Sequence, residues 1–284
     1  MSGKGSFTAY SNLKESIMYK IGYIGAGNMG LPEISATARF LGAGEVCFFE
    51  KDSDRAAFVA GETGAASMGS VAELVKNSEY TVIVVKPQVA PFVYDEIREN
   101  LHGDSKIITS MAGVTTETIA EKLGSNLPII RWMPNLPAMV GEGMTAMSVR
   151  NITEDDEAFS FAKSLCEAFG KVVVIPENLM NAACCANGSS PAYVAMFIEA
   201  LADSVVKYGI PRATAYTLAA QTVLGTAKLI LETGVHPAEL KDRVSSPAGT
   251  TIAAVSALEE NGFRNAVIKA TDACYEKSSG LSGK

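Results

Sequence analysis

Two hydrophobic patterns divide the chain near Pro176. Before it, from Tyr19 to about Ile175, short runs of apolar and often β-branched residues alternate with stretches of helical spacing. Near-continuous apolar strands separated by helices are typical of a parallel sheet covered on both faces, so this half predicts an α/β fold. The expected strands are Ile21–Ile24, Val46–Phe49, Thr81–Val85, Ile107–Ser110, Ile129–Trp132 and Val172–Ile175.

Residues that can cap a helix stand before three of the helical stretches. Asp52 or Ser53 can cap the first, and Thr115 can cap the second. Thr153 is the expected cap of the third, because a first turn rich in acidic residues follows it.

After Pro176 the strand-like runs disappear, and Ala, Leu, Val and Met recur with helical spacing as far as Ser278. Glycine, proline and serine interrupt this half at five places, which predicts five or six helices. The stretches Ala192–Val206 and Ala213–Leu231 are apolar around most of their circumference, so each has to be buried on several sides. A unit of roughly 110 residues cannot enclose both alone, and we expect part of this surface to meet a second subunit.

Composition narrows the kinds of partner. The formal net charge is −7 and no cluster of Lys or Arg stands out, which argues against nucleic acid or an anionic membrane and favours a small-molecule ligand. The five cysteines show neither CxxC spacing nor neighbouring histidines, so we expect no metal site, no disulfide framework and a cytoplasmic location.

The strongest motif is a glycine-rich turn that follows the first apolar run directly and opens a helical stretch. Gly25 permits a tight turn, Gly27 lets the backbone approach a pyrophosphate, and Gly30 lets the helix pack on the strand. A connection without a ligand is the alternative interpretation. The residues expected to hold NADP or NAD here are Gly25, Ala26, Gly27, Asn28, Met29 and Gly30.

The fold expected from these patterns is a Rossmann-type parallel-sheet domain over residues 18–176, followed by an all-α dimerisation domain over residues 177–284. Residues 1–17 are polar and mixed, and are expected to be a loose extension or a cloning remnant without a fold. They lack an apolar core of signal-peptide length, and no apolar run elsewhere reaches the length of a membrane span.

Glu50 ends the second expected strand, where a carboxylate would hold the adenosine ribose by its hydroxyls. A carboxylate there favours NAD because it repels a 2′-phosphate. Lys51 and Arg55 could accept that phosphate if Glu50 turns away, so both coenzymes stay open. A solvated strand end is the alternative.

Three further segments follow expected strands and should meet at the edge where ligands of such sheets bind. Lys86 can hydrogen-bond ribose hydroxyls near the nicotinamide, and the small residues Ala112 and Gly113 leave room for its ring. Ordinary turns are the alternative for each segment. The coenzyme contacts expected here are Lys86, Pro87, Ala112, Gly113 and Asn135.

Two segments rich in glycine, serine and proline lie in the helical half, at 187–193 and 244–251. In the second, a turn opens a helix near Thr250, so backbone N–H groups without helical partners converge with hydroxyls. This arrangement predicts a site for a carboxylate, with a helix that is merely well capped as the alternative. Only two histidines are present, His102 and His236, which leaves a histidine-centred alcohol dehydrogenase mechanism little to work with.

Together these segments resemble the pyrroline-5-carboxylate reductase family, from Tyr19 to about Ser279. The most specific piece is Leu240–Glu259 followed by Asn261–Arg264. Supporting segments occur in the expected order at 85–88, 131–137, 141–144 and 219–225.

Three positions depart from the family pattern. Ala248 replaces the first glycine of an SPGGT turn, Ser190 replaces a glycine, and Asn181 stands where aspartate is usual. An alanine at position 248 requires that this position does not need a positive φ.

The resemblance implies an NAD(P)H-dependent enzyme that reduces the C=N bond of 1-pyrroline-5-carboxylate to L-proline, the last step of proline biosynthesis, without a metal. It implies that Thr251 hydrogen-bonds the ring nitrogen as the catalytic residue. It also implies that Ser246 and the backbone N–H groups of Gly249 and Thr250 hold the substrate carboxylate. The family forms homodimers through interleaved C-terminal helices, and decamers of such dimers are common.

Two other functions are weighed against this one. A β-hydroxyacid dehydrogenase shares the order of domains but needs a lysine in an NxxxK pattern, and here Asn181 is followed by Cys185. A dinucleotide-sensing module without turnover is the second alternative, which an assay with coenzyme and imine would separate from an enzyme.

Overall fold

The computed structural model describes residues 19–282, and the expected extension at 1–17 lies outside them. The chain forms two compact units. The first comprises the described residues up to Gly188 together with those from Tyr275 onward, and the second is Ser189–Cys274. The first unit therefore extends beyond Pro176, and it also includes the last part of α12.

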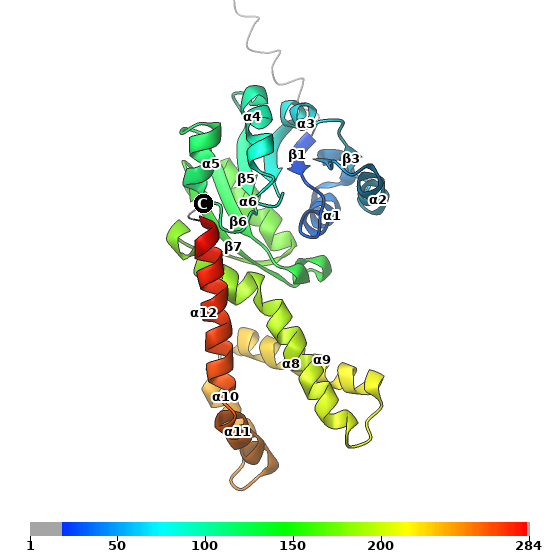
Figure 1. The fold of residues 1–284 in the computed structure, drawn as a ribbon, viewed down its shortest axis with the longest axis vertical. Helices are drawn as coiled ribbons and strands as arrows, with labels where there is room; N and C mark the ends of the chain where they lie inside the picture. Colours follow the sequence, from blue (N-terminus) through cyan, green and yellow to red (C-terminus); the bar gives the residue numbers. More distant parts are fainter. Residues whose placement is uncertain (1–18, 283–284) are drawn as a thin grey trace, which may run out of the picture. The chain divides into compact units, whose positions relative to one another are not determined.

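An eight-stranded sheet in the order β3-β2-β1-β4-β5-β6-β7-β8 forms the centre of the first unit (Figure 1). The strands β1 to β6 pair in parallel, whereas β7 is antiparallel to β6 and β8 is parallel to β7. The strands are β1 (Tyr19–Ile24), β2 (Val46–Phe49), β3 (Ala66–Ser67), β4 (Ser78–Ile83), β5 (Lys106–Thr109), β6 (Ile129–Met133), β7 (Gly143–Arg150) and β8 (Gly170–Val174).

The sheet is mostly parallel, as predicted, but β7 was not among the expected strands. Its side chains Thr145 and Ser148 are almost completely buried, so polar residues interrupt what would otherwise read as an apolar run. The antiparallel direction of β7 follows from the short 3₁₀ turn Leu136–Val140, which joins it directly to β6.

Helices cover both faces of this sheet. One buried cluster contains Ile34 of α1, Val59 of α2 and Leu165 of α6, and the other contains Leu74 of α3 and Ile97 of α4 with residues of α5. The sheet is thus buried between two layers, as its apolar strands predicted. The helices are α1 (Gly30–Leu41), α2 (Ser53–Thr63), α3 (Val71–Asn77), α4 (Pro91–Asn100), α5 (Thr116–Leu123) and α6 (Glu157–Ala168).

Two of the three predicted caps are confirmed. The Asp52 carboxylate accepts from the first-turn N–H groups of α2, and the Thr115 hydroxyl accepts from the N–H of Thr118 in α5. The prediction for Thr153 is wrong, because α6 begins only at Glu157 with Asp156 as its N-cap. Thr153 instead donates its N–H and its hydroxyl to the Asp156 carboxylate.

The helical half begins in the first unit with α7 (Met180–Ala183) and a π-helical turn (Cys184–Gly188). In the second unit α8 packs on α9 through Ala202, Ala215 and Ala219. The remaining helices are α8 (Ser190–Val206), α9 (Arg212–Thr233), α10 (Pro237–Val244), α11 (Thr250–Glu260) and α12 (Phe263–Ser282). No helix within residues 19–282 is long and apolar enough to cross a membrane.

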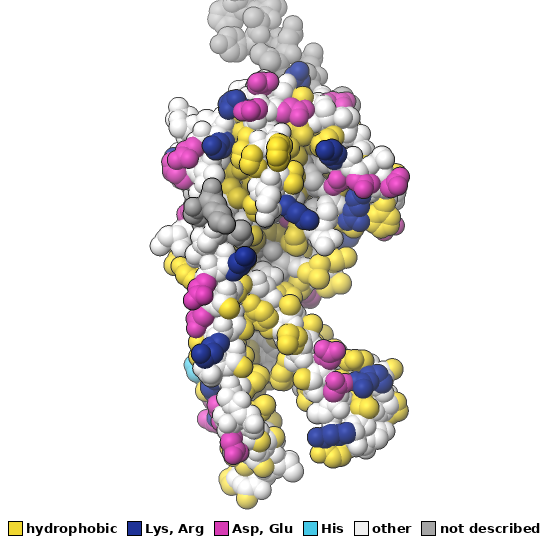
Figure 2. All heavy atoms as spheres, viewed as in Figure 1, with side chains coloured by type: hydrophobic (Ala, Val, Ile, Leu, Met, Phe, Trp, Pro, Cys, Tyr) yellow, Lys and Arg dark blue, Asp and Glu magenta, His cyan; other side chains and the backbone are white. Residues whose placement is uncertain are grey.

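The second unit leaves many apolar side chains at the surface of the single chain (Figure 2). On α9, Leu218 and Leu224 are each about half exposed and Leu231 is 81% exposed. Met196 of α8 is 69% exposed. Isolated apolar residues are ordinary on a surface, but this number on two adjacent helices is typical of a surface that another chain covers.

Candidate active site

The glycine-rich turn joins β1 to α1, and its three glycines have distinct surroundings. Gly25 has a φ of +102°, and its N–H donates to the Phe49 carbonyl at 2.8 Å. A Cβ at Gly30 would lie 2.4 Å from the Gly25 carbonyl oxygen, so only glycine fits. A Cβ at Gly27 would meet no described atom within 4 Å, which leaves open space above the start of α1. This geometry fits a dinucleotide, whose pyrophosphate binds at such a helix start.

Two charged side chains from the second strand and its following helix hold this turn. The Glu50 carboxylate accepts from the N–H of Ala26 at 2.9 Å and from that of Asp52 at 3.2 Å. Arg55 donates from Nε to the Ala26 carbonyl at 2.8 Å and from Nη2 to the Gly27 carbonyl at 3.3 Å. Glu50 is therefore more than a solvated strand end, and its contact with a ribose stays a prediction.

The predicted segments after β4, β5 and β6 emerge at one edge, because these strands are adjacent and parallel. Lys86, Ala112 and Asn135 lie in these three segments. Gly113 has a φ of +73°, in the left-handed region that favours glycine. The glycine-rich turn after β1 and Glu50 after β2 lie at the same edge, because β1 and β2 are parallel to β4.

Asn135 uses its side chain to hold its own loop. Its Oδ1 accepts from the N–H of Met144 at 2.9 Å, and its Nδ2 donates to the Asn187 carbonyl at 3.0 Å. Asn187 in turn donates from Nδ2 to the carbonyls of Met133 and Met144. This pair joins the π-helical turn to β6 and β7, so the predicted coenzyme contact of Asn135 remains untested.

The sequence did not predict an ion pair that joins β6 to the start of the helical half. Arg131 of β6, only 1% exposed, donates to Glu177 at 2.7 Å. The Glu177 carboxylate also accepts from the Ser148 hydroxyl and from the N–H of Thr116. Because Glu177 directly follows Pro176, this cluster fixes the start of the helical half to the sheet.

A completely buried acid lies in the helix that follows the glycine-rich turn. Glu33 is in the first turn of α1, is 1% exposed, and accepts a hydrogen bond from Trp132 Nε1 at 3.1 Å. Burial raises the pKa of Glu33 to about 8, so the carboxyl is largely neutral at neutral pH. Its partner lies 99 residues away in the sequence, and no local spacing could have identified the pair.

The predicted carboxylate site lies in the second unit, between α10 and α11. The turn places Ser246, Gly249, Thr250 and Thr251 together, with the Gly249 N–H donating to the Ser246 carbonyl at 3.0 Å. No side chain caps the start of α11, so its first N–H groups can serve an anion.

Ala248 in this turn has a φ of +58°. The expectation that position 248 does not need a positive φ is therefore wrong. The turn keeps the left-handed geometry that a glycine would adopt, and alanine bears the resulting strain.

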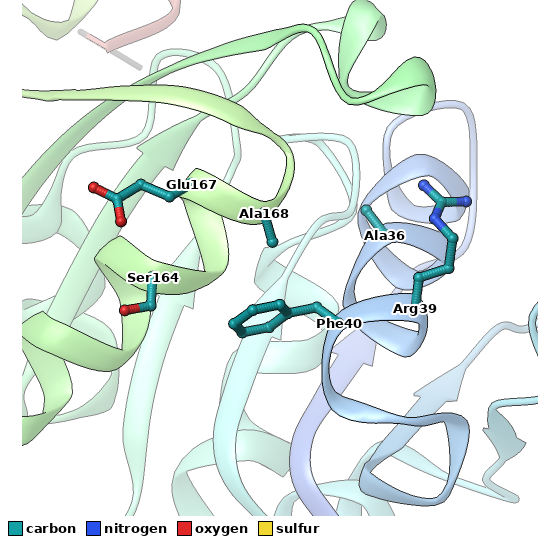
Figure 3. A pocket seen from close by; sticks show the side chains of 6 residues that line it. All are labelled: Ala36, Arg39, Phe40, Ser164, Glu167 and Ala168. Atoms are coloured by element: carbon teal, nitrogen blue, oxygen red, sulfur yellow. The ribbon is translucent and has the colours of Figure 1, made fainter.

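A groove between α1 and α6 lies apart from the predicted residues (Figure 3). Its lining consists of Ala36, Arg39, Phe40, Ser164, Glu167 and Ala168, with the Phe40 ring between the two helices. Within residues 19–282, no group of His, Cys, Asp and Glu is arranged to hold a metal ion.

The fold and the glycine-rich turn define a class, the dinucleotide-dependent oxidoreductases with a helical second half. A family model described as NADP oxidoreductase, coenzyme F420-dependent, matches residues 20–113, and one described as pyrroline-5-carboxylate reductase dimerisation matches residues 177–281. The chain is 42% identical to the pyrroline-5-carboxylate reductase of Escherichia coli (strain K12), over 93% of this chain and 98% of that protein.

Solved structures agree with this likeness. Plasmodium falciparum pyrroline carboxylate reductase with NADP bound matches with a TM-score of 0.85 at 28% identity, over 93% of this chain and 98% of that one. A pyrroline-5-carboxylate reductase from Coxiella burnetii matches with a TM-score of 0.83 at 30% identity, over 93% and 99%. The chain belongs to the pyrroline-5-carboxylate reductase family, which confirms the resemblance and the predicted fold class.

Proposed function

We propose that this chain transfers a hydride from NADPH or NADH to the C=N bond of 1-pyrroline-5-carboxylate, giving L-proline in the last step of proline biosynthesis. The observation that carries the proposal is the combination of an open glycine-rich turn with an uncapped, hydroxyl-rich helix start in a member of this family. Reduction of a cyclic imine suits these residues, because the protonated ring accepts hydride directly and needs mainly orientation.

The direct test is the initial rate of NADH and NADPH oxidation with pyrroline-5-carboxylate, followed by absorbance. Imine-dependent oxidation with proline as product is the expected result. Coenzyme binding without oxidation would instead identify a sensing module, and oxidation only with hydroxyacid or ketoacid pairs would identify a dehydrogenase of the related class.

The coenzyme supplies the hydride when bound, and the first unit's residues bind and orient it. The N–H groups at the start of α1 face the open space above Gly27 and can bind the pyrophosphate. Glu50 and Arg55 keep the turn in this open form. The Glu50 carboxylate accepts from the Ala26 N–H, and the Arg55 guanidinium donates to the Ala26 carbonyl. Lys86, Ala112 and the residues around them then border the nicotinamide half.

The substrate is held by the turn before α11. The Thr250 N–H and the Ser246 hydroxyl hold its carboxylate, because they lie at the positive end of a helix, and the Gly249 N–H joins them when it exchanges its Ser246 carbonyl partner for the substrate. Thr251, half buried at the first turn of α11, directs its hydroxyl to the ring nitrogen and orients the proton there. A C=N bond that is held and protonated in this way would be ready to accept hydride at its carbon.

The second unit makes a homodimer through its exposed apolar helices, and such dimers assemble further into decamers. Support comes from the match of residues 177–281 to a dimerisation model and from the apolar surface of α8 and α9. A cytoplasmic location suits the cysteines, none of which forms a disulfide.

A further inference from the structure

Glu33 is a buried acid for which the proposed reaction has no use. Its Oε2 accepts from Trp132 Nε1 at 3.1 Å, while its Oε1 has no hydrogen-bond partner among the described residues. No Lys or Arg of residues 19–282 forms an ion pair with it. Trp132 itself is completely buried on β6. An unpaired carboxylate is costly in such surroundings, and its presence calls for a specific role.

The neighbouring Ser110 indicates what this role is, because it can pair with the free oxygen of Glu33. Ser110 directly follows β5, its Oγ is buried without a hydrogen-bond partner, and it lies close enough to Glu33 to lower the pKa of the carboxyl. A neutral Glu33 can satisfy both unpartnered atoms with its own proton. Its Oε1 hydroxyl can donate to Ser110 while its Oε2 continues to accept from Trp132.

The charge state of this cluster depends on Glu33 alone near neutral pH. The titratable groups that face it are Tyr23 of β1 and Cys166 of α6, and burial raises the pKa of each well above its usual value. Both therefore stay uncharged. The start of α1 favours a negative charge, but burial without a cation outweighs it and raises the pKa of Glu33 to about 8.

We propose that Glu33 is a positioning residue that joins the start of α1 to the ends of β5 and β6, and so sets the coenzyme site. The segments Met111–Gly113 and Met133–Asn135 continue directly from Ser110 and Trp132. Their position relative to the glycine-rich turn thus depends on this contact. Deprotonation puts an uncompensated charge among apolar side chains and loosens the three elements together.

The first test reads the carboxyl without using the reaction. Trp132 is the only tryptophan of the chain, so selectively excited emission reports its hydrogen bond to Glu33. We expect the emission of the unmodified protein to change in one step near pH 8. Glu33→Gln should show no such step, since its amide can accept from Trp132 and donate to Ser110 at every pH. The same step in Glu33→Gln, or no step in the unmodified protein, overturns the proposal.

The second test measures coenzyme dissociation constants by calorimetry across the same pH range. The unmodified protein should lose about tenfold or more in affinity above pH 8 relative to Glu33→Gln, a ratio that cancels titration of the coenzyme itself. Glu33→Leu, checked for folding by circular dichroism, should bind weakly at every pH.

Identical pH dependence in the unmodified protein and in Glu33→Gln would overturn the positioning role. The inference rests on the proposed function, because the coenzyme site gives the contact its purpose. The two remain distinguishable: imine-dependent oxidation tests the reaction, whereas emission and coenzyme affinity test Glu33 without any imine.

Discussion

Ala248 has a strained backbone, because its φ lies in the left-handed region that an L side chain disfavours. A φ of +58° costs an L-residue roughly 1–2 kcal/mol, whereas glycine adopts it freely. Glycine also makes the unfolded chain more flexible than alanine does, which lowers the free energy of unfolding by about 0.4–1 kcal/mol. Ala248→Gly should therefore raise the free energy of unfolding by up to about 1.5 kcal/mol, measured by urea denaturation.

The matched control is Ala257→Gly, an exposed position within α11. It should lower the free energy of unfolding by about 1 kcal/mol, because glycine weakens a helix interior. Equal destabilisation by the two substitutions would contradict the strain at position 248.

Thr251 gives a sharper prediction because Thr250 beside it offers a control. Thr251→Ala should lower kcat by roughly ten- to a thousandfold, the range expected for a lost hydrogen bond or proton-transfer group, and leave coenzyme affinity unchanged. Thr250→Ala should have a small effect, since only its backbone N–H is assigned to the substrate. Near-normal turnover of Thr251→Ala at saturating imine would show that another group serves the ring nitrogen.

The Glu50 carboxylate accepts from the Ala26 N–H, and its proposed second role is to contact the coenzyme ribose. Glu50→Ser removes the acceptor of the Ala26 N–H, so affinity for both coenzymes should fall. It also removes the charge that repels a 2′-phosphate, so the ratio of kcat/KM should shift towards NADPH. Asp54→Ser, which removes an exposed acid in the first turn of the neighbouring helix α2, should leave the ratio unchanged. A shift towards NADH on Glu50→Ser would show that Glu50 does not face the ribose.

At the scale of elements, Glu177 anchors the start of the helical half. Glu177→Ala would leave Arg131 charged, buried and unpaired, at a cost of about 3–5 kcal/mol in the free energy of unfolding. The control is Glu239→Ala, which breaks the exposed pair with Arg243 and should cost under about 1 kcal/mol. Chemical denaturation of both variants provides the comparison, and similar small losses would mean that solvent reaches Arg131.

The elements that the sequence predicted are those with a strong local pattern. All six expected strands exist because their residues are apolar and mostly β-branched, and five of them are largely buried, whereas Val173 and Val174 of β8 are exposed in the single chain. The glycine-rich turn follows from steric rules that act within a few residues. The strand β7 was not predicted, because its residues Thr145 and Ser148 are polar although they are buried. Glu33, Arg131 and Asn187 escaped for a related reason: each is explained by a partner from a distant part of the chain, which no spacing rule contains.

At the scale of the whole molecule, the apolar surface of α9 makes assembly testable. Leu218 is 51% exposed in the single chain, so a charge there would be tolerated by a monomer. Leu218→Asp should nevertheless cost several kcal/mol if a second subunit covers the site, because an unpaired charge would be buried. Light scattering at micromolar concentration should show a dimer or larger assembly for the unmodified protein and its loss in this variant.

Lys228→Glu provides the control on the same helix, at a position that is already charged and exposed. It should leave the assembly intact. A fully active monomer of the unmodified protein would contradict the proposed dimer, whatever the variants do.

The return of α12 to the first unit matters for how the protein is made. Ser278 donates to the Asn181 side chain at 3.2 Å, so a residue of the last helix packs in the first unit against a residue almost a hundred positions earlier in the sequence. During translation, residues 275–282 are the last of the described chain to leave the ribosome. The sheet-bearing unit is therefore finished only after the helical unit has emerged, and premature termination within the last helix would damage the coenzyme-binding half as well as the half in which the stop occurs.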